Sequence, residues 1–143
     1  MAYKTVRKLK LVDAAYIAGL IDGEGTITLT REHAGENRRL VVSISNTELA
    51  ILSFVRSAVG AGVITSKRTY SNKHTPSYAY KITNRQALTL LSHIAEYLKS
   101  YKRSRAKLAL KQYTAVTPRN GRYTPEQSLT RREFDKRFLA IVP

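Results

Sequence analysis

Two carboxylates, Asp22 and Glu24, flank Gly23 at the end of a short apolar stretch. A hard cation such as Mg²⁺ prefers carboxylate and carbonyl oxygens and keeps several of its waters. The Glu24 carboxylate and the Gly23 carbonyl could supply such ligands, whereas we expect Asp22 to bond local backbone N–H groups and fix the turn. Two solvated carboxylates at a turn are the simpler alternative. With only 10 acids against 25 Lys and Arg, an acidic pair favours the metal site.

The residues before this pair predict a helix that could pack closely against another helix. Asp13 is a plausible N-cap, and the helix should run to about Asp22, where glycines stop it. Ala15 and Gly19 are four residues apart, as are Ala18 and Asp22, and the four share one narrow face. Small residues there let another backbone approach. A short core helix would have the same residues, so the spacing leaves both interpretations open.

The composition indicates one basic domain that meets a polyanion. The 143 residues are 43% hydrophobic, enough to bury a core, and carry a net charge of +15. Such a charge favours nucleic acid over a merely soluble basic surface or an anionic membrane. We expect no membrane span, because no stretch reaches about 18 apolar residues, and no secretory signal. The absence of cysteine excludes disulfides and cysteine-ligated zinc, and it fits an intracellular location.

Hydrophobic periodicity predicts an α+β fold with the order α-β-β-α-β-β-α. The expected elements after the first helix are a strand at 26–30, a turn at 33–38, a strand at 40–45, a helix at 48–59, strands at 63–70 and 78–83, a helix at 85–98 capped by Asn84, and a basic helix at 104–115. A helical segment at 125–142 comes last. We expect a single domain over 1–143, with a core at about 12–115 and an extension at about 117–143. The extension could support a dimer, contact DNA or cover the core.

Alternation along the expected strands gives the sheet a polar face. Hydroxyl, Arg, Lys and Tyr side chains on such a face could bond base edges in a major groove, which admits a β-ribbon. An ordinary solvent face would look similar, and the charge favours DNA. The residues of this predicted face are Thr26, Thr28, Thr30, Glu32, Arg39, Val41, Ser43, Ser45, Thr65, Lys67, Thr69, Tyr78 and Tyr80.

Basic residues also gather around the start of the last core helix. Most should meet phosphate or water, because a solvated face is the usual fate of such a run. One lysine close to the metal could do more, by stabilising charge that develops on a phosphate or by polarising the attacking water. The cluster consists of Lys99, Lys102, Arg103, Arg105, Lys107 and Lys111.

The segment 17–25, Ile-Ala-Gly-Leu-Ile-Asp-Gly-Glu-Gly, resembles the signature of the LAGLIDADG homing endonucleases, and the element order resembles their core. Glu24 stands where the name-giving motif has Asp, so a carboxylate is kept. The resemblance implies an antiparallel, saddle-shaped sheet. It also implies an intron-encoded, Mg²⁺-dependent DNA endonuclease that makes a double-strand break in a long pseudo-palindromic target. Because the motif occurs once, the enzyme should be a homodimer whose signature helices pack at the two-fold axis.

The resemblance further assigns roles to residues of this chain. Glu24, with the Gly23 carbonyl, should bind the metal. Asn46, or else Ser45, should position water at the end of the second strand. Lys102, or else Lys99 or Arg103, should complete the catalytic site. Lys99 and Arg103 should also contact DNA, and the interface between copies should contain Ala15, Ala18, Gly19 and Asp22. No small-molecule substrate is expected.

Two other functions fit the same residues. One is a non-catalytic nucleic-acid binder, such as an intron maturase or a transcription regulator. The other is a basic structural protein associated with the ribosome.

Overall fold

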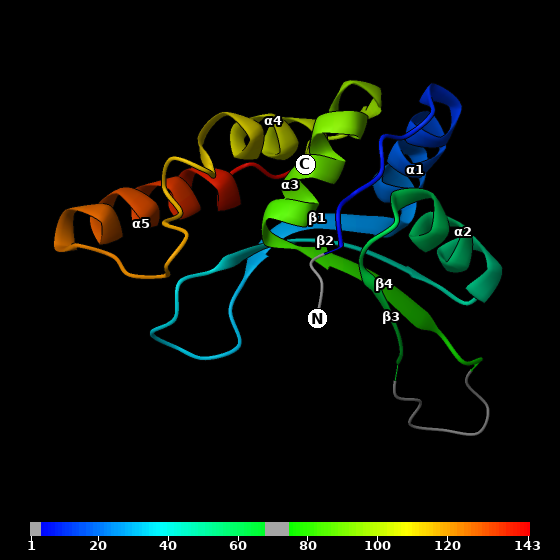
Figure 1. The fold of residues 1–143 in the computed structure, drawn as a ribbon, viewed down its shortest axis with the longest axis horizontal. Helices are drawn as coiled ribbons and strands as arrows, with labels where there is room; N and C mark the ends of the chain where they lie inside the picture. Colours follow the sequence, from blue (N-terminus) through cyan, green and yellow to red (C-terminus); the bar gives the residue numbers. More distant parts are fainter. Residues whose placement is uncertain (1–3, 68–74) are drawn as a thin grey trace.

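The computed structural model describes residues 4–67 and 75–143. It contains the expected core order and C-terminal helix (Figure 1). The elements are α1 (Leu11–Glu24), β1 (Gly25–Thr30), β2 (Arg39–Asn46), α2 (Leu49–Val59), β3 (Val63–Ser66), β4 (Tyr78–Thr83), α3 (Asn84–Ile94), the short 3-10 helix η1 (Ala95–Tyr97), α4 (Lys102–Gln112) and α5 (Pro125–Leu139). The predicted α+β class is therefore confirmed. None of the helices in the described ranges is long and apolar enough to cross a membrane.

The four strands form one antiparallel sheet in the order β1-β2-β4-β3. Helices α1 to α4 cover one face, and α5 lies beyond the β1–β2 end (Figure 1). The sheet arches so that its two ends bend away from the helices, and its other face carries no helix. We call this second face the open face. An uncovered antiparallel sheet face is stable in water only if its outward residues are compatible with solvent or a ligand.

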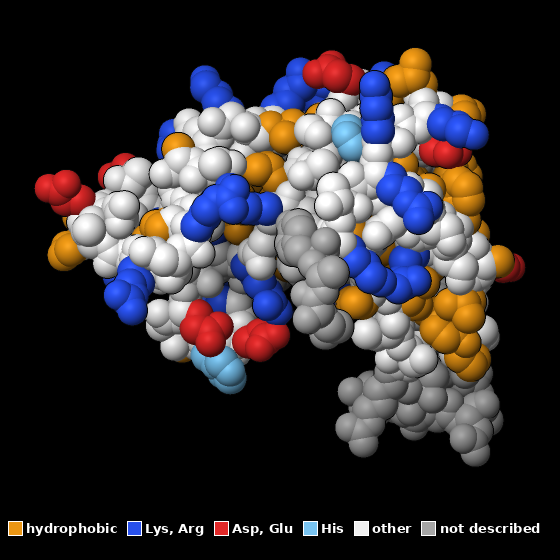
Figure 2. All heavy atoms as spheres, in the orientation of Figure 1, with side chains coloured by type: hydrophobic (Ala, Val, Ile, Leu, Met, Phe, Trp, Pro, Cys, Tyr) orange, Lys and Arg blue, Asp and Glu red, His pale blue; other side chains and the backbone are white. Residues whose placement is uncertain are grey.

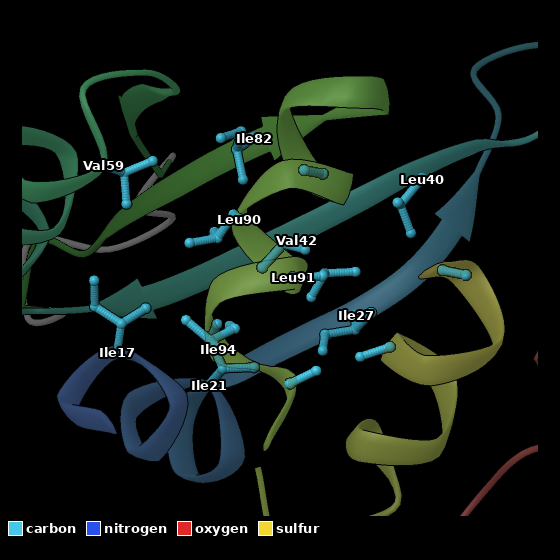
Figure 3. Close-up of a cluster of buried hydrophobic side chains, with 14 of the residues drawn as sticks. Ile17, Ile21, Ile27, Leu40, Val42, Val59, Ile82, Leu90, Leu91 and Ile94 are labelled. Atoms are coloured by element: carbon cyan, nitrogen blue, oxygen red, sulfur yellow. The ribbon is translucent and has the colours of Figure 1, made fainter. Parts of the chain in front are cut away.

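The core lies between the sheet and the helix layer. Every second residue of each strand points into it, as the alternation of β-structure requires. Figure 3 shows Ile27, Leu40, Val42 and Ile82 from the strands meeting Ile17, Ile21, Val59, Leu90, Leu91 and Ile94 from the helices. The N-terminal segment also belongs to this layer, because Val6 and Leu9 are buried and the Arg7 N–H donates to the Val59 carbonyl at 2.8 Å.

Helix α1 is longer than the sequence predicts. Its N-cap is Lys10 without a side-chain hydrogen bond, so the prediction of Asp13 as the cap is wrong. Asp13 lies in the first turn, where its carboxylate interacts favourably with the positive end of the helix dipole. The helix also continues through Gly23 to Glu24, because an interior glycine costs only about 1 kcal/mol. Gly25 is the C-cap.

Gly25 is required by a close approach of backbones. A Cβ at this position would lie 2.8 Å from the Ile21 Cα and 2.8 Å from the Ser43 carbonyl oxygen. Real Cβ atoms do not come so close to backbone, so any side chain here would push α1 away from β2. Glycine therefore sets the position of Glu24 relative to the sheet.

Several later boundaries also differ from the expectations. Thr83 is the N-cap of α3, and Asn84 is the first helical residue, with φ of 54°. The amide oxygen of Asn84 does not cap the helix but accepts a hydrogen bond from the Tyr113 hydroxyl at 3.1 Å. Helix α4 begins earlier than expected, at Lys102. Strand β3 ends at Ser66, and the predicted strand residues Thr69 and Tyr70 lie outside the described residues.

The C-terminal extension packs onto the core. Helix α5 begins with a capping box, in which the Gln127 N–H donates to the Thr124 hydroxyl and the Thr124 N–H donates to the Gln127 side chain. Phe134 and Phe138 are fully buried in the core, four residues apart on one helix face. Core cover is thus one role of residues 117–143.

Candidate active site

The candidate site is the last turn of α1, where the helix passes directly into β1, and we call its residues Asp22, Gly23 and Glu24 the acid turn. Gly23 and Glu24 are exposed there, whereas Asp22 is half-buried. The Glu24 side chain has no hydrogen bond to another described residue. Its carboxylate is therefore open to a ligand.

Asp22 is bound to the segment that precedes α4. Its Oδ2 accepts from the Lys99 N–H at 2.8 Å, and its Oδ1 accepts from the Ser100 N–H at 3.2 Å and the Ser100 hydroxyl at 2.5 Å. Burial raises the pKa of Asp22, but these hydrogen bonds and the charge of Lys102 together hold it below its ordinary value of 3.8. The expectation that Asp22 fixes the turn through backbone N–H groups is right in kind. Those groups are not local, because they come from 77 and 78 residues further along the chain.

Lys102 approaches the same turn from the other side. Its side chain is 8% exposed, and its ammonium donates to the carbonyls of Ile21 at 2.8 Å and Asp22 at 3.0 Å. The last carbonyls of a helix have no partner within the helix and carry the negative end of its dipole, so a cation is stabilised there. Asp22 and Lys102 thus join α1 and α4 reciprocally, and the lysine charge lies next to Gly23 and Glu24.

The other basic residues around α4 are directed elsewhere. Arg103 and Lys107 pair with Glu96 at 3.0 and 3.5 Å. Arg105 donates to the carbonyls of Ile141 at 2.8 Å and Ile27 at 2.9 Å, so it ties α4 to the C-terminal tail and to β1. Lys99 remains exposed beside the acid turn. Of this cluster, Lys102 is the residue whose side chain contacts the end of α1, whereas Lys99 contacts it through its backbone N–H.

The two polar candidates at the end of β2 occupy opposite sides of the sheet. The Asn46 amide oxygen accepts from the Glu48 N–H at 2.8 Å, and by alternation Asn46 shares the side of the buried Ile44. Ser45 comes directly after the Gly25–Ile44 pair, which brings it level with Glu24 on the open-face side. The register therefore places Ser45 beside the acid turn and gives Asn46 a local role in starting α2. The assignment of a water-positioning role to Asn46 stays a prediction.

The donor set at the acid turn suits Mg²⁺ in one specific way. The described residues contain no group of three or more His, Asp or Glu side chains that could enclose a metal ion. Mg²⁺ does not need such a cage, since it is commonly held by one or two carboxylates together with waters and phosphate oxygens. One exposed carboxylate, a nearby carbonyl and space for a phosphate fit that pattern.

The open face carries most, but not all, of the residues expected on it. Thr26, Thr28, Thr30, Arg39, Val41, Ser43, Ser45 and Thr65 lie there by register, and Thr26 and Ser43 share a hydrogen bond of 2.7 Å between their hydroxyls. Glu32 lies just past β1 and pairs with Arg39 at 2.7 Å. Lys67 comes directly after β3 and is exposed, whereas Thr69 lies outside the described residues.

The prediction that Tyr78 and Tyr80 of β4 lie on the open face is wrong, because both lie on the core side of the sheet. Tyr80 is fully buried, and its hydroxyl donates to the Ala61 carbonyl at 2.6 Å. Tyr78 has the same parity and packs against the core. The open-face residues of β4 are instead Ala79, Lys81 and Thr83. Lys81 is exposed and stands in register with Ser43, so it belongs to the open face, although the sequence prediction does not include it. Ile82 is apolar and predicts a core position, so its neighbour Lys81 is predicted on the opposite face by strand alternation.

The outer face of α1 is apolar and exposed. Ala15 and Gly19 lie on it, but Ala18 is fully buried in the core of its own chain, so its assignment to an interface is wrong. The Asp22 carboxylate, likewise, is engaged within the chain. No atom lies within 4 Å of a Cβ built at Gly19 or Gly23, so nothing within the described protomer requires glycine there.

Larger apolar side chains border these glycines. Leu11 is 74% exposed, Val12 is 73% exposed, and Tyr16 packs edge-on against the exposed Phe54 of α2 with ring centroids 5.5 Å apart. Figure 2 shows hydrophobic side chains gathered along the right-hand edge, where α1 and α2 lie. Contiguous exposed apolar surface of this kind indicates a protein–protein contact.

Comparison with solved structures finds the same fold in homing endonucleases. Among solved structures, the homing endonuclease I-CvuI in complex with its target has a TM-score of 0.74 and 20% identity, with 92% of this chain and 83% of that chain covered. The archaeal intron-encoded homing endonuclease I-Vdi141I, complexed with DNA, has a TM-score of 0.61 and 14% identity, over 92% and 85%. The LAGLIDADG meganuclease I-AabMI, bound to uncleaved DNA, has a TM-score of 0.63 and 20% identity, over 85% of this chain and 43% of that one.

No curated protein matches the sequence. A family model does match, that of the LAGLIDADG-like domain, over residues 11–143. The match includes the signature segment, the acid turn and all the helices and strands of the structure. The chain therefore belongs to the LAGLIDADG-like domain family.

Proposed function

We propose that this chain is a site-specific homing endonuclease, which acts as a homodimer and makes a metal-dependent double-strand break in a long pseudo-palindromic DNA target. The observation that carries the proposal is the turn at Glu24, where an open carboxylate and the buried Lys102 ammonium meet the end of α1 beside an arched, polar sheet face. The solved proteins of the same fold were crystallised with DNA, which supports DNA as the substrate.

The open face fits a DNA groove in size and chemistry. Strands of six to eight residues span roughly 20 to 27 Å at about 3.3 Å per residue, somewhat less than one turn of B-DNA of about 34 Å. Hydroxyls at Thr26, Thr28 and Ser43 can donate to and accept from base edges, and Arg39 and Lys81 can donate to guanine or phosphate. Two copies would cover more than one turn of duplex, which fits a long target with two half-sites.

The homodimer accounts for residues that the protomer alone leaves unexplained. Gly19 and Gly23 have open space around them, and they lie on the same exposed, apolar face of α1. A second α1 packed on this face would use that space, because small residues let helix backbones come close. The packing would also bring two copies of Glu24 together near the two-fold axis, one for each DNA strand.

The proposed chemistry is hydrolysis of a phosphodiester at each of these turns. We propose that Glu24 and the Gly23 carbonyl hold Mg²⁺ together with a DNA phosphate. A bound divalent cation activates water and stabilises the leaving oxygen. I-CvuI was crystallised with DNA in the presence of Ca and of Mg, which supports a divalent ion. Lys102, fixed by two carbonyls, keeps a positive charge beside the phosphate without reorganisation, and this stabilises developing negative charge.

The test is the variant Glu24→Gln, assayed on a plasmid library that contains the native insertion site. We expect this variant to bind the target in Mg²⁺ but to cut it at least about 100-fold more slowly, because a neutral amide holds the metal poorly. Glu36→Gln, in the exposed turn after β1, is the matched control and should cut normally. Normal cutting by Glu24→Gln would refute the catalytic assignment. A parent chain that binds but never cuts would support the non-catalytic binder instead.

The dimer has a separate test. Gly19→Val fits the protomer, since nothing lies within 4 Å of the new Cβ, but it should hold two α1 helices apart. We expect the parent to sediment as a dimer on target DNA at micromolar concentration and the variant to be monomeric. A monomeric parent under these conditions would contradict the proposed assembly.

A further inference from the structure

Arg131 of α5 is the charge with the most hydrogen-bond partners among the described residues, and it lies far from the acid turn (Figure 1). Its side chain is 1% exposed. The Nε donates to the Asp135 carboxylate at 2.8 Å, and Nη1 donates to the hydroxyls of Thr117 at 3.0 Å and Tyr123 at 3.1 Å. The Nη2 donates to the carbonyl oxygen of Arg38. A buried guanidinium is costly unless its donors are paired, and here each of the three nitrogens has at least one hydrogen-bond partner.

The same guanidinium lies against two neighbouring aromatic rings. Its Cζ lies 5.1 Å from the centroid of Tyr113 and 5.8 Å from that of Phe134. The Tyr113 hydroxyl in turn accepts from the Leu40 N–H at 3.4 Å and donates to Asn84 at 3.1 Å. Arg131 therefore joins α5, the segment between α4 and α5, and the beginning of β2. We call this junction the α5 brace.

The brace meets the sheet at one specific place. Arg38 is the last residue before β2, and its own side chain reaches back to the Leu29 carbonyl at 3.5 Å. Arg39, the next residue, lies on the open face in register with Thr30. The position of the Arg38 carbonyl and the Leu40 N–H thus fixes where Arg39 stands. Within residues 31–38, the backbone has a single turn hydrogen bond, from the Glu36 N–H to His33 at 3.2 Å. That connection therefore cannot hold its own end rigidly.

The braced end is distant from the chemistry. From Gly25 to Thr30, β1 rises roughly 17 Å at about 3.3 Å per residue, which corresponds to about five base-pair steps at roughly 3.4 Å each. A change at the brace should therefore alter contacts about five or more base pairs from the acid turn. It should leave Glu24, Lys102 and their neighbours in place.

We propose that Arg131 is a positioning residue for DNA specificity, which acts through the α5 brace to hold Arg39 and Thr30 in register with the outer base pairs of each half-site. The inference rests on the proposed function. It assigns residues 117–143 a role in target selection that goes beyond covering the core. Free movement of the β2 start would let Arg39 reach several bases, so discrimination at these positions would be lost while binding persisted.

The test compares Arg131→Met and Arg131→Lys with the parent as full-length dimers. The methionine removes every hydrogen bond, and the lysine keeps the charge but loses the planar fork. Arg132→Met, an exposed neighbour on the same helix, is the matched control. Each protein is assayed for kcat/KM on targets with single substitutions at every position. Amide hydrogen exchange of the DNA-free protein reports independently on the brace.

We expect a base-pair mismatch at an outer position to cost the parent about 5- to 150-fold, and both Arg131 variants only a few-fold. Central mismatches and kcat on the matched target should stay close to the parental values. Exchange at the Leu40 amide should be about tenfold faster or more in Arg131→Met, because local opening becomes easier. Arg132→Met should match the parent in all three measurements.

Two results would overturn the proposal. One is unchanged outer discrimination in both Arg131 variants, and the other is an equal loss of discrimination at all positions, which would reduce Arg131 to general stability. If Arg131→Met does not fold, Arg131→Lys decides by the same criteria. A parent without selective DNA binding would refute the proposed function itself. In that case the Leu40 amide exchange still tests the brace. An unchanged exchange rate in the Arg131 variants would refute the brace, and a faster rate would show that it is a structural junction.

Discussion

The bond between Asp22 and the segment before α4 makes a quantitative prediction about stability and pH. Asp22→Asn keeps the size of the side chain but leaves one oxygen acceptor where there are two. In the parent, Oδ1 accepts two donors from Ser100 and Oδ2 accepts the Lys99 N–H. The asparagine NH₂ group, itself a donor, would face either the Lys99 N–H or the Ser100 donors. Hydrogen bonds to a charged group are worth about 1.5 to 3 kcal/mol each. Because Asp22 is only half-buried and water can replace a partner, we expect a total loss of about 1 to 2 kcal/mol at pH 7.

The pH dependence of this loss depends on the direction of the pKa shift. Hydrogen bonds and Lys102 outweigh burial and lower the pKa of Asp22 below 3.8 in the folded state. The ionised carboxylate therefore contributes its full stabilisation at pH values above the pKa that Asp22 has in the unfolded chain. This contribution is lost as the pH falls from about 3.8 through the lower folded pKa. The difference in unfolding free energy between parent and variant should be constant above about pH 5 and should shrink below about pH 4.

The assay is urea unfolding from pH 2.5 to 7 at one fixed protein concentration, because the stability of a dimer depends on concentration. Glu36→Gln, an exposed acid in the turn after β1, is the control and should stay within about 0.5 kcal/mol of the parent at pH 7. The reasoning is refuted if Asp22→Asn is as stable as the parent at pH 7. It is also refuted if the difference persists unchanged to pH 2.5.

Three further substitutions test other parts of the structure. Gly25→Ala should lower the unfolding free energy by about 1 to 3 kcal/mol and abolish cutting, because its Cβ would meet backbone at 2.8 Å; unfolding and plasmid cleavage check this, and normal cutting would contradict it. Tyr80→Phe should cost about 1 kcal/mol in urea unfolding through the lost bond to Ala61, with no change in DNA affinity, whereas weakened binding would revive the open-face assignment. Lys81→Ala should weaken DNA binding and reduce the slope of log affinity against log salt by about 1; an unchanged slope in a titration would remove Lys81 from the DNA surface.

Local pattern was sufficient for much of the fold. Thr26 to Thr30 alternates strictly, and the structure buries Ile27 and Leu29 as expected. Gly60 ends α2 in the left-handed conformation, which its sequence position predicts. Such features depend on near neighbours, so the sequence contains the information needed for them.

The errors and omissions have a different origin. The polar phenol predicts Tyr80 on the DNA surface, but its hydroxyl donates to the Ala61 carbonyl inside the core. Asp22 meets Ser100 across 78 residues, and no local pattern announces such a pair. Arg131 belongs to a strongly charged helix and resembles its exposed neighbours in sequence, yet it is buried because three segments converge on it. Contacts of this kind require the tertiary arrangement.

Helix α1 joins β1 without an intervening residue, since Glu24 ends the helix and Gly25 begins the strand. This junction has no tolerance for insertion or deletion. One added residue in the helix would rotate β1 by about 100° around the helix axis, and it would exchange the buried and open faces of the strand. The residues 31–38 have no such restriction, because loop lengthening costs little. Homologues of this protein should therefore change their DNA targets by substitutions along the strands and by length changes in that loop. The number of residues between Leu11 and Thr30 should stay constant.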